Sequence, residues 1–585
     1  MKGIIVSAAS FLCAFSVFPS FADEPAFASP PDVMFGSVPG EEKPALSGKI
    51  SVGSGKKEVS GGTIESAAVD ESALLSENGA TIVVKSAEIR KSGGSSNSGQ
   101  SNFYGLNAGV LSDGGKISLI KTSVATDAEG ANAVFSTGEN SFVTLQDVKI
   151  TTKGNSSRGL DATYGGKIRA RGVDITTEGE HCAAFATDRG EGTVVVEKGT
   201  AVTRGNGSPV IYSTGDIRVS KLKGSAESSE IACIEGKNSI SIDGCELSGG
   251  AGLSGETASA VMLYQSMSGD ANVGTARFSS SSSSLSNVSD GPFFFVTNTD
   301  AEIHLESTKI ENPSGILLKV SGNDSSRGWG RAGANGGNLS FSAKKQRLEG
   351  DIIVDGISSL SLNLGKMSSF KGKLNEDGQG NVELCLAKNA VFEMTGDCHV
   401  NSIRDDDVTF SNIISHGNTL YYDSSDEKNA HLNGITIRLR DGGKIAAENR
   451  HSERKSTATE KSHSPEKKSA GTVPSQPPLS VVSGILLADN SVEPASYSIT
   501  GKDGTVTKIR VMMPHPQKNG NPPSPPPSGA GKPMKNPPSP PAEKSRPAPI
   551  TESALASLSG KNVDAKGIPE KDGTLIILEI TESQR

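Results

Sequence analysis

The chain has 585 residues, of which 68 are glycine and only 4% are aromatic, and its formal net charge is −8. The charge argues against nucleic acid as the main partner, and the scarcity of rings favours a core of small and β-branched side chains. Of six cysteines, five lie beyond residue 22, and their odd number and spacing fit neither a disulfide framework nor a zinc site. Cys233 and Cys245 take positions that hold Val or Ala in other coils, which predicts small core side chains. Cys385 and Cys398 could form one bridge.

Residues 1–22 have the features of a secretory signal peptide. Lys2 precedes an apolar stretch, and a small-x-small site predicts cleavage after Ala22. The alternative, an N-terminal membrane anchor, is disfavoured because the apolar stretch is shorter than the roughly 20 residues that a span needs. We therefore expect an exported protein, secreted or at the cell surface (the periplasm or the outer membrane face being alternatives), without a membrane span after cleavage.

A repeat organises the chain between Gly105 and Leu247. Each copy has a buried apolar pair, a turn rich in Ser, Thr, Gly and Asp, and a short strand of alternating apolar and polar residues. The strand starts lie 26, 25, 26, 23 and 23 residues apart. They are Ile117, Val143, Ile168, Val194, Ile217 and Ile240. A period of this length leaves no room for a helix, so it predicts strands stacked coil upon coil in a parallel β-helix.

Changes in composition divide the rest of the chain. The predicted segments are a flexible leader (23–47), the parallel β-helix (48–440), a charged polar linker (441–478), a short β segment (479–512), a basic Pro-rich linker (513–550) and a C-terminal strand segment (551–585). An insertion of small polar residues at 92–103 is predicted to be a flexible surface loop. The apolar strand at 574–580 needs a partner, and a hairpin at 497–512 would supply one, giving a small C-terminal β module.

The coil pattern resembles a known superfamily. Its form, Ala/Gly-x-apolar-x-x-x-Gly-Gly-x-Ile-x-Leu, is similar to that of pectate-lyase-like right-handed parallel β-helices and of autotransporter passenger domains. The segments at 261–270, 293–298 and 327–330 resemble secreted, adhesin-like bacterial β-helix proteins, and the resemblance covers about residues 130–400. It implies an all-β, right-handed solenoid exposed at a bacterial surface.

This superfamily contains polysaccharide lyases and pectin-degrading hydrolases, which require carboxylates at set positions. The Asn-Thr-Asp at 298–300 matches the first hydrolase motif. No Asp-Asp follows about one coil later, and His416 and the three aspartates at 405–407 come too far along the chain. We therefore expect no catalytic residues, no metal and no cofactor.

Three aspartates leave an alternative open. Asp161, Asp188 and Asp216 follow strands in successive coils and could stack into a metal-binding or catalytic cluster. Otherwise they are residues of turns and of the solvent-facing surface, which is the interpretation that we favour.

Trp329 is the only tryptophan and lies in a Gly-rich loop beside Arg327, Arg331 and Asn335. An exposed ring flanked by polar side chains can stack on a sugar, so these four residues are the candidate ligand-binding residues. Alternatively, the indole packs a long turn against the side of the solenoid.

The sequence thus favours a non-catalytic, adhesin-like binding rod that contacts glycans or host or envelope proteins. The alternatives are a polysaccharide lyase or hydrolase on a β-helix scaffold, and a structural envelope component. Convergence of three or more acidic residues from different coils in one groove would favour the enzyme.

Overall fold

The computed structural model describes residues 43–253, 258–266, 268–323, 327–448, 480–489, 496–500, 506–511, 561–569 and 575–582. The predicted signal peptide with its cleavage site, most of the leader, most of the charged linker and the Pro-rich linker lie outside these described residues. The chain divides into two compact units, one ending at Lys461 and the other beginning at Ser462.

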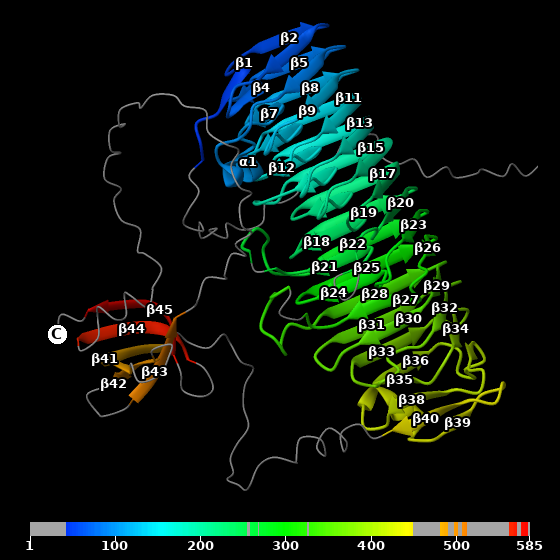
Figure 1. The fold of residues 1–585 in the computed structure, drawn as a ribbon. Helices are drawn as coiled ribbons and strands as arrows, with labels where there is room; N and C mark the ends of the chain where they lie inside the picture. The colour runs from blue at the N-terminus through cyan, green and yellow to red at the C-terminus, as the bar shows by residue number, and fades with distance from the viewer. Residues whose placement is uncertain are drawn as a thin grey trace, which may run out of the picture. The chain divides into compact units, whose positions relative to one another are not determined.

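The first unit is a right-handed parallel β-helix of about 16 turns (Figure 1). Twelve parallel strands form its first sheet, which we call sheet A. They are β1 (Ser47–Val52), β4 (Glu71–Glu77), β7 (Val110–Asp113), β10 (Val134–Thr137), β12 (Leu160–Thr163), β14 (Phe185–Thr187), β16 (Ile211–Ser213), β18 (Ala232–Glu235), β21 (Val261–Tyr264), β24 (Phe294–Thr297), β27 (Ile316–Val320) and β30 (Asp351–Val354).

A second set of parallel strands, sheet B, bends once in each coil, so that it has a first arm before the bend and a second arm after it. The strands of the first arm are β2 (Lys56–Ser60), β5 (Thr81–Lys85), β8 (Lys116–Ile120), β11 (Phe142–Thr152), β13 (Lys167–Thr177), β15 (Thr193–Thr203), β17 (Asp216–Ala226), β19 (Ser239–Asp243), β22 (Ala276–Ser281), β25 (Asp300–Glu306), β28 (Asn338–Lys344), β31 (Ser359–Leu364), β33 (Asn381–Leu386) and β36 (Ser402–Asp405). The 11-residue strands β11, β13, β15 and β17 continue around the bend into the second arm. The other strands of the second arm are β3 (Thr63–Ser66), β6 (Glu88–Lys91), β9 (Ser123–Thr126), β20 (Glu246–Gly249), β23 (Ser284–Asn287) and β26 (Lys309–Glu311), which β29 (Arg347–Glu349), β32 (Ser369–Gly372), β34 (Val391–Met394) and β37 (Ile413–Ile414) follow in a further sheet.

The strand register confirms the predicted repeat. Val143 of β11 pairs with Ile117 and with Ile168, and the same row continues through Val194 and Ile217. These side chains point inward and belong to one apolar core that runs along the solenoid. Each strand is therefore held by the coil on either side, as expected of a repeat protein.

The bend of sheet B needs one residue per coil in the left-handed backbone region. Lys121, Asp147, Lys198 and Lys221 take φ values of 49°, 55°, 65° and 54° at this corner. In the six-serine run at 279–284, Ser282 has φ 49° and separates the end of β22 from the start of β23. A run that looks featureless in sequence thus supplies parts of two strands and the corner between them.

The insertion at 92–103 was predicted to be a loop. The prediction is wrong for its second half, which forms most of helix α1 (Ser98–Tyr104). Asn97 caps the helix, its side-chain oxygen accepting from the Gln100 N–H at 3.0 Å. Gly105 ends it with φ 70°, and a β-carbon at Gly105 would lie 2.6 Å from the ring of Phe135. The helix forms because it is capped at both ends and packs closely on sheet A.

The C-terminal end of the solenoid departs from the regular pattern. Here β35 (Cys398–Val400), β38 (Thr419–Asp423) and β40 (Lys444–Glu448) stack in parallel, and β39 (Ile437–Arg438) pairs antiparallel with β40. The 3-10 helix η2 (Glu427–Leu432) lies between β38 and β39 in the chain. Strands of the solenoid therefore continue to Glu448.

The second unit is a closed five-stranded barrel with strand order β41-β42-β43-β45-β44. Its strands are β41 (Ser480–Asp489), β42 (Ser496–Thr500), β43 (Val506–Val511), β44 (Asn562–Pro569) and β45 (Leu575–Glu582). The predicted hairpin is β42–β43. The predicted partner of the C-terminal strand is confirmed, because β45 pairs in parallel with β43 of this hairpin. The sequence analysis missed β44, which pairs with both β41 and β45.

The five cysteines in the described part of the chain are free thiols. Cys398 is buried in the core, whereas Cys385 is half-buried at an outward position of β33. These two thiols face different sides of the wall, so the bridge that the sequence left open does not form. None of the helices within the described ranges is long and apolar enough to cross a bilayer.

Candidate functional site

The outer face of sheet A is covered along its middle coils. In β10, β12, β18, β21 and β24 all four residues of the strand are buried, although alternate side chains point away from the core. The outward row, in register from strand to strand, is Leu111, Phe135, Asp161, Ala186, Tyr212, Cys233, Met262 and Phe295. Helix α1 covers the first part of this row and the loop that carries Trp329 covers the last part.

Between these two covers lies a cavity of about 520 Å³, which we call the sheet A cavity. The acidic side chains Asp188, Glu230 and Asp270 line it together with Arg158 and Arg327. Its aromatic lining comes from Phe103, Tyr212, Tyr264 and Trp329. A volume of this size is typical of small-molecule sites, and the mixture of rings and charged groups is unusual for a surface that only packs.

Arg158 links two buried aspartates at the floor of the cavity. Its Nε lies 3.5 Å from Asp161 Oδ2 and its Nη2 lies 3.2 Å from Asp188 Oδ2, while Nη1 donates to Asn102 Oδ1 at 2.5 Å. Burial raises the pKa of Asp161 well above its usual range and raises that of Asp188 to about 6, against the opposite effect of the nearby guanidinium. One guanidinium therefore compensates two carboxyl groups only in part.

Glu235 is 2% exposed and is held by neutral donors. The Tyr212 hydroxyl donates to Oε2 at 3.1 Å, and the Ser266 N–H donates to Oε1 at 3.2 Å. The hydroxyls of Ser266 and Ser268 also donate to Oε1. Burial raises the pKa of the Tyr212 phenol well above its usual range, so this hydroxyl keeps its proton and remains a donor. No ion pair to Glu235 occurs among the described residues.

A stack of rings forms one wall. The rings of Tyr264 and Trp329 are 4.3 Å apart between centroids and inclined by 20°, and the Arg327 guanidinium lies 4.8 Å from the Trp329 ring centre. Met262 and Cys233 pack beneath them in one cluster. The indole thus lies against the side of the solenoid and also lines the cavity.

Arg189 holds Asp270, which lines the cavity. Arg189 Nη2 lies 2.6 Å from Asp270 Oδ1, and its guanidinium lies 3.8 Å above the centre of the Phe103 ring. This contact ties helix α1 to the loop that follows β21. The pair therefore fixes the position of the Asp270 carboxylate at the edge of the cavity.

The structure separates the four candidate ligand-binding residues. Trp329 and Arg327 line the cavity, whereas Arg331 is exposed and does not line it. Asn335 is 3% exposed, and its Nδ2 donates at 2.9 Å to the carbonyl oxygens of Asn323 and Trp329. Its place is beneath the loop, where it holds the indole in position.

The three stacked aspartates also separate. Asp161 and Asp188 meet at Arg158, but Asp216 lies on sheet B and pairs with Arg218 at 2.7 Å. The sequence analysis missed Arg158 and Glu235. Glu235 could have been found from the sequence, because it is a charged residue at the end of the otherwise apolar strand Ala232–Glu235. This pattern indicates that the outer face of the strand is covered.

The remaining catalytic patterns do not assemble. Asn298 takes φ 54° in the turn between β24 and β25 and donates to the Gln265 carbonyl at 2.7 Å. His416 contacts Glu393 at 3.2 Å, away from the aspartates at 405–407. The described ranges contain no group of three or more His, Cys, Asp or Glu side chains placed to hold a metal ion.

Comparison with models of protein families, with curated proteins and with solved structures gave no match.

Proposed function

We propose that this protein is an exported, adhesin-like β-solenoid that binds a glycan in the sheet A cavity without transforming it. The observation that carries this proposal is the Tyr264–Trp329 stack on the wall of a cavity that also presents carboxylates and guanidinium groups. Aromatic rings give a sugar an apolar contact surface. Carboxylates and guanidinium groups accept from and donate to its hydroxyls.

The charges around the cavity indicate which class of glycan it would bind. Asp188, Glu230 and Asp270 line the cavity, and Glu235 lies just behind Tyr212. Because a carboxylate-rich wall repels anions at short range, the favoured ligand is a neutral or amine-bearing sugar. The resemblance to secreted adhesin-like bacterial proteins, together with the signal peptide predicted at residues 1–22, supports a place outside the cell.

The test is a glycan-binding screen with the purified full-length exported chain and its Trp329→Ala variant. We expect one class of neutral or amine-bearing glycan to bind, and the dissociation constant to rise at least about tenfold in the variant, since a contact of about 1.4 kcal/mol is lost. Tyr421→Ala is the matched control, because Tyr421 is a half-buried ring stacked on His399 outside the cavity. Binding that Trp329→Ala leaves unchanged, or a screen without a bound glycan, would contradict the proposal.

A second candidate function is polysaccharide cleavage. It is favoured by the convergence of Asp188, Glu230 and Asp270, from different coils, in one cavity. Asp188, a buried acid with a pKa of about 6, can act as a proton donor at neutral pH, and Asp270, paired with Arg189, supplies a second carboxyl group. The same screen decides: new reducing or unsaturated ends that disappear in Asp188→Asn would replace binding by catalysis as the function.

A further inference from the structure

A separate trough runs along the outer surface of the first arm of sheet B. Two depressions form it, one of about 370 Å³ over β8, β11, β13 and β15, and one of about 700 Å³ from β15 to β31. β15 contributes lining residues to both, Lys198 to the first and Val195 and Val196 to the second. Neither shares a lining residue with the sheet A cavity.

The trough is straight because its side chains are in register. One outward row follows ten adjacent strands, spaced at about 4.8 Å, for a length of roughly 43 Å. The row is Ser118, Thr144, Arg169, Val195, Arg218, Ser241, Ser279, His304, Ser342 and Asn363. Such a line fits an extended polymer lying parallel to the solenoid axis better than a compact ligand.

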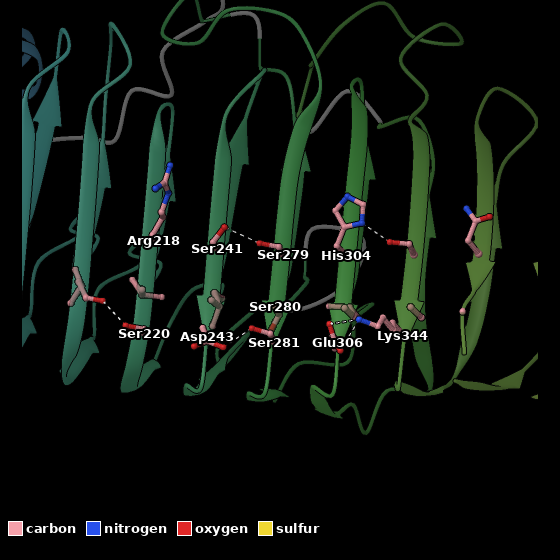
Figure 2. A pocket seen from close by; sticks show the side chains of 18 of the residues that line it. Arg218, Ser220, Ser241, Asp243, Ser279, Ser280, Ser281, His304, Glu306 and Lys344 are labelled. Atoms are coloured by element: carbon pink, nitrogen blue, oxygen red, sulfur yellow. Dashed lines mark hydrogen bonds and ion pairs between the residues drawn. The ribbon is translucent and has the colours of Figure 1, made fainter. Parts of the chain in front are cut away.

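Short hydroxyl side chains form the floor in the middle of the larger depression (Figure 2). Ser241 and Ser279 are hydrogen-bonded to each other at 2.8 Å, and Ser281 donates to Asp243 at 2.5 Å. Figure 2 shows Arg218 at one end of this serine floor and Lys344 at the other. Serine hydroxyls therefore lie in the middle of a depression whose lining also includes apolar groups such as Val195, and cations flank these hydroxyls.

The trough is basic in a chain that is acidic overall. Its lining contains six cationic side chains and three carboxylates, whereas the whole chain has 58 Lys and Arg against 66 Asp and Glu. The cations are Arg169, Arg171, Lys198, Arg218, Lys344 and Lys366. This reversal of charge is local to one surface.

Glu306, which lines the trough, and Glu197, which contacts the lining residue Arg171, are each shared between two cations, whereas no ion pair to the lining residues Asp147 and Asp243 occurs among the described residues. Glu306 lies between Lys344, at 3.1 Å, and Lys345, at 3.4 Å. At the other end, Glu197 lies 3.8 Å from Arg171 and 3.6 Å from Lys221. One carboxylate cannot neutralise two cations, so a positive charge remains at both places. The Arg171 and Lys344 side chains are 72% and 62% exposed, so these ion pairs are weak and can be exchanged for a ligand anion.

We propose that this trough is a second binding site, which takes a linear acidic polysaccharide extended along the solenoid axis. Its carboxylate or sulfate groups contact the arginines and lysines, and its hydroxyls contact the serine floor. Since the site lies on another sheet and has the opposite charge, the inference does not depend on the proposed glycan site in the sheet A cavity.

The test compares two triple variants of the full-length chain. Arg171→Ser/Arg218→Ser/Lys344→Ser removes cations along the trough. The matched control, Lys149→Ser/Lys223→Ser/Lys309→Ser, removes three exposed lysines from a single row on the second arm. Both variants change the net charge equally, and circular dichroism and the melting temperature establish that each is folded.

The probes are an oligogalacturonate and a heparin-derived oligosaccharide, each about ten sugars long to match the strands of the trough, with a neutral glucose oligomer and a short duplex DNA as comparisons. We expect an acidic glycan to bind, more weakly as salt increases, and its dissociation constant to rise at least about tenfold in the trough variant but not in the control. The two acidic probes distinguish carboxylate from sulfate recognition. Trp329→Ala should leave this binding unchanged.

Four outcomes would overturn the inference: no binding of either acidic glycan, equal binding of the neutral oligomer, equal weakening in the two triple variants, or binding of duplex DNA as tight as that of the acidic glycans.

Discussion

Two asparagine side chains hold the backbone of Trp329. Asn335 donates to the Trp329 carbonyl, and the Asn323 side-chain oxygen accepts from the backbone N–H of Trp329 at 3.0 Å. Sequence analysis grouped Asn335 with the exposed residues because it stands in a Gly-rich loop. Asn335 is buried beneath the loop because its amide, with two donor hydrogens, ties together the backbone carbonyls of Asn323 and Trp329.

Replacing Asn335 by Ala should loosen the loop without unfolding the solenoid. Because Trp329 is the only tryptophan, its fluorescence reports this site alone. We expect a red-shifted emission maximum and stronger quenching by acrylamide, since two hydrogen bonds worth about 1 kcal/mol each are lost. Asn363→Ala, an amide on the outer surface of β31, is the control and should leave the emission unchanged. An unchanged emission in Asn335→Ala would show that the loop is held by other contacts.

Asp188 should make the stability of the solenoid depend on pH. Its pKa is about 6 in the folded chain, above the ordinary value of 3.8. Between these two values the unfolded chain has released the proton that the native state keeps, so stability falls as the pH rises through this window. The loss is at most about 3 kcal/mol for roughly two pKa units.

Asp188→Asn cannot ionise and should escape this loss. We expect the melting temperature of the variant, relative to the unchanged chain, to rise from pH 4 to pH 7. Asp174→Asn, at an exposed position of β13, is the control and should show no such trend. A constant difference across the pH range would mean that Asp188 is charged in the native state throughout.

At the scale of the element, the strands could be predicted from the sequence, whereas helix α1 and the loop that carries Trp329, which cover the outer face of sheet A, could not. The inward side chains alternate with polar ones, so the row from Ile117 to Ile217 could be aligned from the sequence alone. Helix α1 could not be predicted from the sequence, because its seven residues are mostly small and polar and would not form a stable helix alone. It exists because caps at both ends and packing against Phe135 support it. The one available signal was the Phe103-Tyr104 pair at the end of a small polar insertion.

The same limit applies to the sheet A cavity. Periodicity reveals which side chains leave the core, but not what later segment returns to cover them. Asp161 and Asp188 were recognised as stacked positions, whereas Arg158 was overlooked, since its role depends on two carboxylates contributed by different coils. The aromatic wall likewise combines a strand residue, Tyr264, with a loop residue far along the chain, Trp329.

At the scale of the whole molecule, the two compact units should unfold separately. The first unit ends at Lys461, and the described strands on either side of this boundary pair only within their own unit. A fragment spanning 23–461 should therefore melt within about 2 °C of the main transition of the full chain. Calorimetry of the fragment and the full chain checks this. A larger decrease would mean that residues 462–585 stabilise the solenoid.

The full in-register pairing of β11, β13, β15 and β17 has an evolutionary consequence. Each of these strands presents the same edge to the next one, so an in-frame duplication or deletion of one complete coil would rejoin matching edges and leave every other coil unchanged. Natural variants can therefore lengthen or shorten by whole coils, and the reach of the trough would change in steps of one strand spacing. Insertions of a few residues should be tolerated only at the turns, where the lining of the two proposed binding sites can diversify without altering the length.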